Sequence, residues 1–452
     1  MSFLQLVSQM TPVRRWLSRK NPFFVCDFYF VLVLVIFLGF AANYVGIYDF
    51  IFFEKSFDND FTWPPRVFDN GFYQDHQRTS DGRRIDYVEF SASLTSSLEE
   101  WKLNSAFWKL EKENDFSERP AFAQGMMSMV GQIPVLRQHI KYLQFITTPV
   151  ADMPAPTACT LFHSSKSVGL VILVKSAVTH SARREAIRKT WAAASAHTMA
   201  KNGKESLYQV LFVVGVGGTH TSGTGGADVG VGPTTGFTYQ YQADLMEEQA
   251  THGDLIQLQF LDTYFNNTAK TIAGLHYLLD KCPILDARNG FVFFSDDDML
   301  LNMKNMEKLL DGIRAERDLQ SVPNDVYLGH QFPGSKPQRW RWSKWYISTD
   351  EYPFSWYPPY ITAAAVLLSK DTAEKFFYAS HFVPLFRFDD IYLSIIAHML
   401  QISSQDRSDA IWFDYVPFEG NAELYRDKMI AAHGFHQPEF MISTYQRLIA
   451  VS

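Results

Sequence analysis

The sequence predicts an α/β domain carried behind a single transmembrane helix, and three observations support this prediction. Residues 28–48 form one uncharged apolar run. After residue 160, short apolar runs alternate with longer helical patterns, which is typical of a mainly parallel sheet covered by helices. The 452 residues are 47% hydrophobic, so the chain can bury one large core or two ordinary ones.

The apolar run, FYFVLVLVIFLGFAANYVGIY, is long enough to cross a membrane. As a helix rising about 1.5 Å per residue, it spans about 31 Å, the thickness of a bilayer core. Basic residues precede it and acidic residues follow it, so we expect residues 1–27 in the cytosol and the rest of the chain in a lumen. A cleaved signal peptide, with Ala41 and Ala42 near the cleavage point, is the alternative, but the run begins late and exceeds the usual length.

Residues 49–160 have weak periodicity and predict a lumenal stem, and residues 161–452 predict the folded domain. Within that domain we expect strands near Val168–Val174, Tyr208–Val214 and Phe291–Phe294. Helices are expected between them, over residues 181–197, 241–251 and 266–282. The Gly-rich stretch 215–236 predicts a flexible insertion, because its spacing matches neither a P-loop nor a dinucleotide-binding loop. The net charge of -7 argues against a nucleic-acid-binding protein, which needs a basic face.

Cysteine usage and one sequon fit a lumenal domain. Cys26 lies at the predicted cytosolic membrane edge, where it is either a palmitoylation site or an inert residue. In an oxidising lumen Cys159 and Cys282 are expected to form a disulfide that closes a long loop, and two buried thiols are the alternative. No cysteine and histidine spacing is typical of zinc, so a zinc site is not expected. Asn266 begins the sequon NNT, which predicts glycosylation, and it equally suits the N-cap of the helix that follows.

The stretch FVFFSDDDMLLN, residues 291–302, places three carboxylates directly after a predicted buried strand. In an extended backbone Asp296 and Asp298 point to one side and Asp297 to the other. The C-terminal ends of strands are where α/β sheets bind ligands, and paired carboxylates there suit Mg²⁺ or Mn²⁺ with open positions for substrate phosphates. The triplet therefore predicts a metal-dependent nucleotide-sugar site, with a solvated turn as the alternative.

Six sequence blocks carry a resemblance to one enzyme family: RREAIRKTW, VLFVVG, GDLIQLQFLDTYFNNTAKT, FFSDDDMLLN, KWYISTDEYPFSWYPPY and RFDDIYLS. In this order they resemble the inverting β-1,3-galactosyltransferases and β-1,3-N-acetylglucosaminyltransferases of the Golgi membrane. The resemblance runs from about Cys159 to the C-terminus and includes the tail, anchor and stem of a type II membrane protein. It implies a GT-A fold, with a nucleotide-sugar part at residues 161–302 and an acceptor part at residues 303–452. It also implies Mn²⁺ (with Mg²⁺ as the alternative), UDP-galactose or UDP-N-acetylglucosamine as donor, and a glycan on protein or lipid as acceptor.

The resemblance assigns expected roles to the acidic residues. Asp296 and Asp298 match the metal-binding D-x-D, and His433 resembles a histidine that completes the metal site. Asp390 matches the general base, which would take the proton from an acceptor 3-hydroxyl as that oxygen attacks the anomeric carbon with inversion. We expect Asp389 and Asp390 in the first turn of a helix, where the macrodipole favours ionised carboxylates, with Asp389 in the structural role.

Contacts with the nucleotide sugar are expected from Arg184, Arg188, Asp296 and Asp297. The two arginines match the family block RxxIRxTW and lie at positions i and i+4 of a predicted helix, where both can reach phosphate or uracil. An exposed helix face laced with salt bridges is the alternative. Aromatic residues in WRWSKWY and YPFSWYPPY are expected either in the core or stacked on acceptor sugar rings.

Three departures from the family pattern motivate a second function. Phe294 stands where the family has Lys, and Ala363 and Ala365 stand where it has Gly. The alternative is therefore a non-catalytic, membrane-anchored relative that acts as a chaperone or a carbohydrate-binding protein. Retention of all three triplet aspartates and of Asp390 favours the enzyme.

Overall fold

The computed structural model describes residues 31–39, 139 and 143–451, with gaps at 162–167, 194–207, 218–240, 264–265, 283, 286–289, 320–324, 350, 382 and 384. Residues 31–39 form a helix inside the predicted anchor, whereas the rest of the anchor, most of the stem, Cys26 and most of the Gly-rich stretch lie outside the described residues. Within the described part of the chain, no helix combines the length and apolar character needed to cross a membrane. The chain divides into two compact units, one of which contains Lys336–Trp356 and the other Thr62–Ser335 with Tyr357–Ser452.

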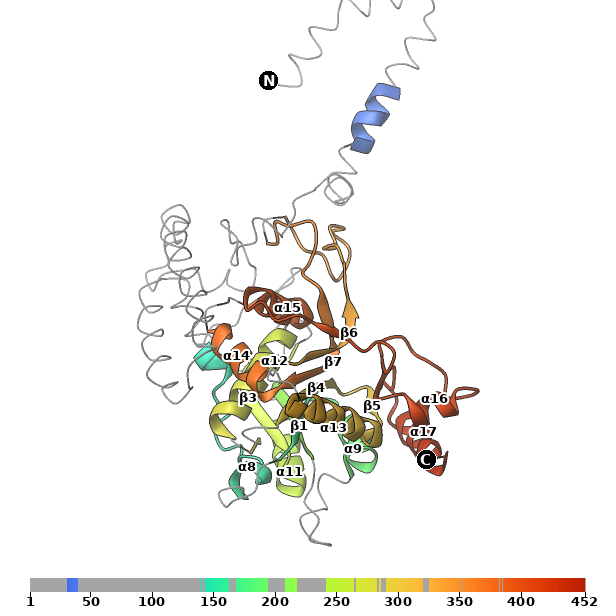
Figure 1. Cartoon of the computed structure of the whole chain (residues 1–452). Coiled ribbons are helices and arrows are strands. Elements are labelled where there is room, and N and C mark those ends of the chain that lie inside the picture. Colours follow the sequence, from blue (N-terminus) through green and yellow to red (C-terminus); the bar gives the residue numbers. More distant parts are fainter. Residues whose placement is uncertain are drawn as a thin grey trace, which may run out of the picture. The chain divides into compact units, whose positions relative to one another are not determined.

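A seven-stranded sheet organises the larger unit (Figure 1). The strands lie in the order β3 (Leu255–Leu261), β2 (Tyr208–Val216), β1 (Leu170–Lys175), β4 (Phe291–Asp296), β7 (Tyr360–Ser369), β6 (Tyr327–Phe332) and β8 (Gln405–Asp406). The first four are parallel, as the sequence predicts, but β7 is antiparallel to both β4 and β6. The sheet is therefore mixed, because β7 returns beside β6 without the helical crossover that a parallel pair requires.

The helices that bear on the site are α9 (Ser181–Lys189), α12 (Asn267–His276) and α15 (Asp389–Met399). The other helices from residue 157 onward are α8 (Thr157–Leu161), α11 (Gln242–His252), η5 (Tyr277–Lys281), α13 (Met303–Leu319), α14 (Lys370–Ser380), α16 (Ala422–Asp427) and α17 (Pro438–Val451). The helix predicted over residues 181–197 ends early, and the Thr190 hydroxyl donates to the Ala186 carbonyl 2.7 Å away. Such a back-bond competes with continued helix.

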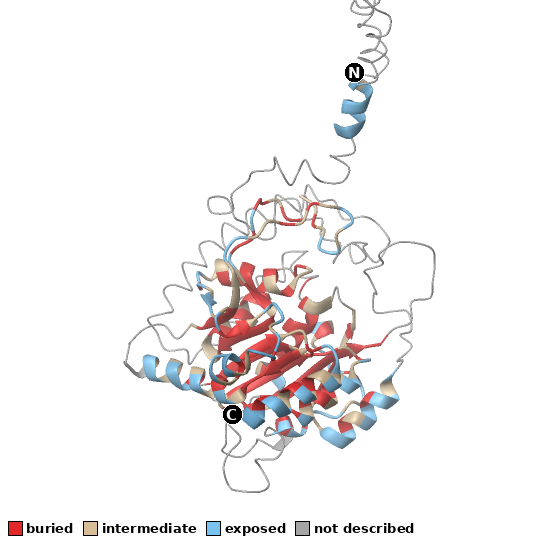
Figure 2. Cartoon of the chain, turned by 90° about the vertical axis from the view of Figure 1, so that its right-hand side faces the viewer, coloured by how far each residue is buried: buried red, intermediate tan, exposed pale blue. Residues whose placement is uncertain are grey.

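Strand β1 shows how side-chain alternation divides the core between two faces of the sheet. Leu170, Ile172 and Val174 belong to a buried cluster with residues of α9, α13 and α17. Lys175 points to the opposite face, where it contacts α15. Figure 2 shows the buried sheet between its helical layers. Because β1 and β4 are paired in register, Lys175 lies opposite Asp296, and both side chains belong to the same face.

The larger unit extends N-terminally past the predicted stem boundary at residue 160. Val150 donates its amide to the Gln257 carbonyl of β3, and Thr157 donates to the Gly253 carbonyl, which joins this segment to the sheet. Cys159 and Cys282 are bonded as a disulfide, with their Cα atoms 4.7 Å apart. The disulfide attaches the same segment to the end of η5.

A second, small sheet carries the C-terminal histidines. It consists of β5 (Met299–Leu301), β10 (Ala431–His433) and β9 (Ile411–Trp412). Strand β10 pairs antiparallel with β5, so that His433 lies opposite Met299, one residue after the aspartate triplet. This pairing brings the C-terminal region of the chain to the end of β4.

Within the smaller unit, Arg339 organises the segment Lys336–Trp356. Its buried guanidinium donates to the carbonyls of Ile347, Ser348, Tyr352 and Phe354 at 2.7–2.9 Å. Several tryptophans of the segment are exposed on its surface, Trp342 (66%), Trp345 (50%) and Trp356 (43%). The hydrogen bonds of Arg339 thus hold together a segment with aromatic rings exposed on its surface, which we call the braced aromatic loop.

Candidate functional site

The aspartate triplet separates at the end of β4 into three different environments. Asp296 is the last residue of the strand, and one of its carboxylate oxygens lies 2.9 Å from the Lys175 ammonium. Burial and the negative charges of Asp298 and Asp389 raise the pKa of Asp296 to about 6, although Lys175 opposes this shift. Asp296 and Asp297 contact opposite faces of the sheet, as strand alternation predicts, since Asp297 contacts α9.

Asp297 is held by a dense set of donors. Its carboxylate accepts hydrogen bonds from the Ser176 hydroxyl at 2.8 Å and the Arg183 guanidinium at 2.9 Å, and it lies 2.7 Å from His180 Nδ1. Burial would raise its pKa, but the hydrogen bonds and charges of His180 and Arg183, with the Ser176 bond, lower the pKa of Asp297 to about 2. Asp297 is therefore ionised and committed to internal contacts. Its predicted contact with the nucleotide sugar stays a prediction.

Asp298 and two histidines form a metal-compatible cluster. One Asp298 oxygen lies 2.8 Å from His436 Nδ1 and 3.6 Å from His433 Nε2. The other oxygen, Oδ1, is buried and has no hydrogen-bond partner among the described residues. An orphaned carboxylate oxygen in a buried site is costly unless a cation or another donor satisfies it. The residues therefore fit a divalent ion, and the mixed carboxylate and imidazole donors suit Mn²⁺ better than Mg²⁺, which prefers oxygen ligands.

The acidic pair at the start of α15 is also divided. Asp389 and Asp390 occupy the first turn of the helix, which confirms the predicted placement. Asp389 is buried and accepts from Lys175 at 2.7 Å and from Thr271 at 2.8 Å; burial opposes ionisation, but these contacts lower its pKa. Asp390 accepts from the Ile391 amide at 2.8 Å, and no ion pair to it is found among the described residues. Burial and the adjacent charge of Asp389 raise the pKa of Asp390 to about 7.

Arg184 and Arg188 lie inside an ion-pair network behind the triplet. Arg184 is fully buried and forms a bidentate pair with Glu248 at 2.7–2.8 Å, while it also donates to the Ser176 hydroxyl at 3.0 Å. Arg188 pairs with Asp254 and Glu248 at 2.7 Å. Through Ser176, the Arg184 guanidinium supports the Asp297 carboxylate. Their predicted approach to the nucleotide is not tested by these contacts.

The remaining predicted residues are placed as follows. Asn266 precedes α12 at the N-cap position, but its side chain makes no capping bond and donates instead to the Leu261 carbonyl at 2.8 Å. Phe294 and Ala365 are buried in the sheet, at 1% and 0% exposure, so neither side chain lines an open pocket. Ala363 is partly exposed, and its carbonyl accepts from Lys175 at 2.9 Å. Of the three departures, Ala363 is the one that lies beside the site.

Lys175, Arg183 and His436 are among the contributing residues that the sequence did not predict, as are Ser176, His180 and Thr271. Arg183 joins Asp297 to the loop of His436, because its guanidinium also donates to the His436 carbonyl at 3.0 Å. The spacing of His433 and His436, two imidazoles three residues apart, was the available signal for the second histidine. Lys175 and Arg183 had no local signal, since their partners lie more than one hundred positions away.

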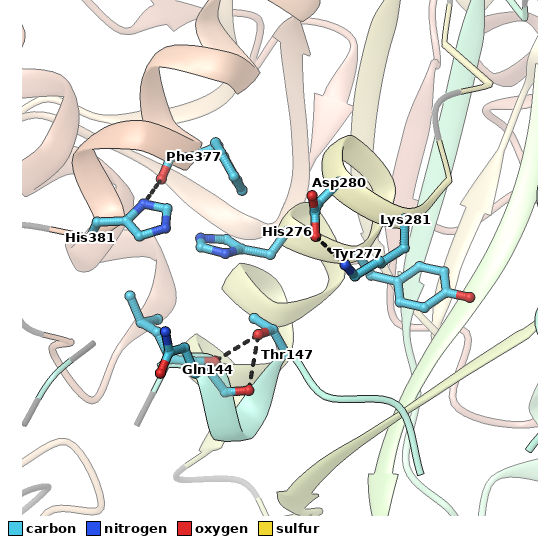
Figure 3. A pocket seen from close by; sticks show the side chains of 9 residues that line it. Gln144, Thr147, His276, Tyr277, Asp280, Lys281, Phe377 and His381 are labelled. Atoms are coloured by element: carbon cyan, nitrogen blue, oxygen red, sulfur yellow. Dashed lines mark hydrogen bonds and ion pairs between the residues drawn. The ribbon is translucent and has the colours of Figure 1, made fainter. Parts of the chain in front are cut away.

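A separate cavity of about 250 Å³ lies near the disulfide, between residues 143–147, the end of α12 with η5, and α14 (Figure 3). None of the predicted catalytic, nucleotide-binding or metal-binding residues lines it. Ser380 Oγ donates to the Phe377 carbonyl, so His276 Nε2 is the donor in its 2.7 Å contact with that hydroxyl. Burial lowers the pKa values of His276 and His381, which favours the neutral form of both imidazoles.

Comparisons with known proteins identify the family of the chain. The family model described as Galactosyltransferase matches residues 230–408, which include the triplet and the Asp389–Asp390 pair. A β-1,3-galactosyltransferase of Drosophila melanogaster, named brn, is 36% identical over 272 residues, 60% of this chain and 72% of the relative. The human β-1,3-galactosyltransferase 5 is 28% identical over 62% of this chain and 78% of the relative. A lactosylceramide 1,3-N-acetyl-β-D-glucosaminyltransferase of Xenopus tropicalis is 28% identical over 60% of this chain and 64% of the relative.

The chain belongs to the galactosyltransferase family, and it is a hexosyltransferase. The family expected from the six sequence blocks is thereby confirmed, as is the α/β class of the fold.

Proposed function

We propose that this protein is a metal-dependent, inverting β-1,3-glycosyltransferase of the GT-A type. It transfers galactose or N-acetylglucosamine from a UDP-sugar to the 3-hydroxyl of a glycan acceptor. The observation that carries the proposal is the pairing of two unlike acidic sites in one unit: Asp298 with its orphaned oxygen beside two imidazoles, and Asp390 with its raised pKa. Both sugars are named among the relatives, which supports the two candidate donors.

Asp298, His433 and His436 would hold the divalent ion, with Asp296 as a further predicted ligand. When bound, such an ion supplies Lewis-acid stabilisation of the negative charge that develops on the departing UDP, worth several kcal/mol. Asp297 keeps the turn between these ligands in place through Ser176, His180 and Arg183. The chain thus provides a rigid acidic site for the diphosphate side of the donor.

Asp390 acts on the acceptor side as general base. It takes the proton of the attacking 3-hydroxyl while that oxygen bonds to the anomeric carbon and the bond to UDP breaks, so an α-linked donor gives a β-linked product. A pKa of about 7 suits this step, because the carboxylate is basic enough to accept the proton and is still substantially ionised near neutral pH. The exposed tryptophans of Lys336–Trp356 are candidate stacking surfaces for acceptor sugars on protein or lipid.

We also propose a type II arrangement in the Golgi membrane, with residues 28–48 as the anchor and the folded domain in the lumen. The charge asymmetry around the apolar run supports this orientation. The disulfide between Cys159 and Cys282 is consistent with an oxidising compartment. Glycosylation at Asn266 would follow from the same placement and is checked by endoglycosidase treatment of the protein from secretory cells.

The experiment that tests the proposed function is a transfer assay on the purified full chain. UDP-galactose, UDP-N-acetylglucosamine and UDP-glucose are each offered with galactose-, N-acetylglucosamine- and mannose-terminated acceptors, with Mn²⁺, with Mg²⁺ and with chelator. We expect a β-1,3-linked product, identified by nuclear magnetic resonance, from one of the first two donors and a loss of transfer with chelator. An α-linked product, or equal transfer in chelator, would contradict the proposal.

A further inference from the structure

Lys175 is a buried lysine at the end of β1 to which the proposed mechanism gives no role. Its ammonium contacts three acceptors: Asp389 Oδ2 at 2.7 Å, Asp296 Oδ1 at 2.9 Å and the Ala363 carbonyl at 2.9 Å. An ammonium has three protons, so these contacts account for all of its donors. The three acceptors belong to α15, β4 and β7, which makes Lys175 the meeting point of four elements.

The position of these partners distinguishes Lys175 from an ordinary ion pair. Asp296 begins the triplet on the metal side of the site, and Asp389 directly precedes the candidate base Asp390. We propose that Lys175 is a positioning residue that fixes the distance between the metal-binding end of β4 and the base-bearing start of α15. This inference rests on the proposed function, because it assigns a purpose to the spacing of those two groups.

Burial makes this connection stiff. The side chain of Lys175 is 4% exposed and that of Asp389 is 9% exposed, so water does not compete effectively for the pair. Thr271 of α12 donates to the same Asp389 oxygen at 2.8 Å and restricts the carboxylate further. A buried pair contributes little net stability relative to apolar residues of the same size, but removing one member leaves an uncompensated charge. Geometry is therefore a better explanation for the lysine than stability.

The spacing matters because the proposed reaction needs attack from the side opposite the leaving group. A displacement of about 1 Å in a reacting group can cost about 10²-fold in rate. Without the ammonium, Asp296 and Asp389 would be two like charges on the same face of the sheet, and repulsion would move β4 and α15 apart. The base on α15 would then lose its alignment with the metal-binding end of β4.

The test compares Lys175→Met with the double variant Lys175→Met/Asp389→Asn in the full chain. Methionine keeps the length of the stem and removes the charge, and the double variant removes one positive and one negative charge together. We expect Lys175→Met to lower kcat by about 10²-fold, with the donor KM within about 3-fold of the parent, and to lower Tm. We expect the double variant to recover Tm and to keep the low kcat, because the connection is still absent.

Lys270→Met is the matched control. Lys270 is equally buried, at 4% exposure, pairs with Asp262 at 2.7 Å and donates to the Ser176 backbone carbonyl at 2.6 Å, but its ammonium has no contact among the described residues with a carboxylate of the triplet or of the α15 pair. We expect Lys270→Met to lower Tm by a similar amount, with kcat of the folded enzyme within about 5-fold of the parent.

Recovery of both Tm and kcat in the double variant would overturn the inference, since Lys175 would then serve stability alone. An unchanged kcat in Lys175→Met would also overturn it. If Lys175→Met does not fold, the double variant and Lys270→Met decide the question. Failure of the proposed function is distinguishable, because the unsubstituted chain would then give no transfer with any donor.

Discussion

The site contains two acidic segments, the triplet at the end of β4 and the pair at the start of α15. In the triplet, internal hydrogen bonds hold the middle carboxylate, Asp297, whereas in the pair they hold the first carboxylate, Asp389. The difference follows from backbone geometry. Strand alternation turns Asp297 towards α9, away from Asp296, while the first turn of α15 directs Asp389 to Lys175 and Thr271. In each segment a neighbouring carboxylate lies in a different environment and has the proposed chemical role: Asp298 in the triplet and Asp390 in the pair. Consecutive aspartates can therefore have opposite protonation tendencies and separate roles.

The largest expected effect comes from Asp298, the triplet residue with the orphaned oxygen. Asp298→Asn keeps the size of the side chain and removes its charge, so we expect transfer to fall by about 10³-fold or more, since several kcal/mol of charge stabilisation depend on the ion. Mn²⁺-dependent binding of UDP, measured by titration calorimetry, should be lost while circular dichroism is unchanged. Full activity in this variant would remove the metal assignment.

Replacement of Asp297 tests whether the hydrogen-bonded carboxylate of the triplet stabilises the fold. Asp297→Asn weakens several buried charge-assisted hydrogen bonds, and we expect a loss of about 1–3 kcal/mol in the free energy of unfolding, measured in urea. The folded-state pKa of Asp297 lies below its unfolded value, so its stabilisation is present above about pH 4 and is lost as pH falls through about 2. The difference between parent and variant should shrink over that range.

An exposed aspartate supplies the control for this measurement. Asp311, with a side chain 74% exposed and an i,i+3 contact to Arg314, should change stability by less than about 0.5 kcal/mol when replaced by Asn. Equal losses of unfolding free energy in Asp297→Asn and Asp311→Asn would contradict the conclusion that the internal hydrogen bonds of Asp297 stabilise the fold.

The pH dependence of kcat/KM tests Asp390, the carboxylate of the α15 pair that we propose as the base. A base with a pKa of about 7 is mostly protonated at pH 6 and mostly ionised at pH 8, so kcat/KM should rise by about 10-fold between these values. The raised pKa also means that ionisation of Asp390 opposes folding, so its contribution to stability is lost as pH rises through about 7. A profile that is flat from pH 6 to 8 would contradict the assignment of Asp390 as base.

The smallest expected effect concerns the braced aromatic loop. Trp342→Ala should raise the acceptor KM by about 2- to 10-fold, corresponding to about 0.5–1.5 kcal/mol of lost stacking, with the donor KM as the internal control. An unchanged acceptor KM would show that the Trp342 ring does not contact the acceptor sugar.

Much of this comparison was predictable from the sequence. The run FVFF before the triplet predicted β4, and strand alternation predicted that Asp296 and Asp297 separate. The apolar pattern after Asp390 predicted α15 and the place of the acidic pair in its first turn. These features depend on local patterns of two or four residues.

The partners of the aspartates were not predictable in the same way. Lys175 meets Asp296 because of the register between β1 and β4, and His436 meets Asp298 because β10 pairs with β5. The antiparallel placement of β7 likewise depends on tertiary pairing that no local pattern encodes. The positions of the acidic groups were therefore predictable from the sequence. Most of the cationic side chains that determine which carboxylates are ionised were not.

The most direct test of the divided acidic pair is a side-by-side measurement of kcat, donor KM and Tm for Asp390→Asn and Asp389→Asn. We predict that Asp390→Asn lowers kcat by about 10²-fold with donor KM nearly unchanged and Tm unchanged or raised, because it removes the base, no ion pair, and a carboxylate whose ionisation opposes folding. Asp389→Asn should lower Tm, because it weakens the contacts with Lys175 and Thr271, and it should lower kcat less than Asp390→Asn does, because the Asn carbonyl oxygen can still accept a hydrogen bond from Lys175. The reverse pattern, with kcat lost in Asp389→Asn and Tm lost in Asp390→Asn, would contradict the assignment and make Asp389 the base.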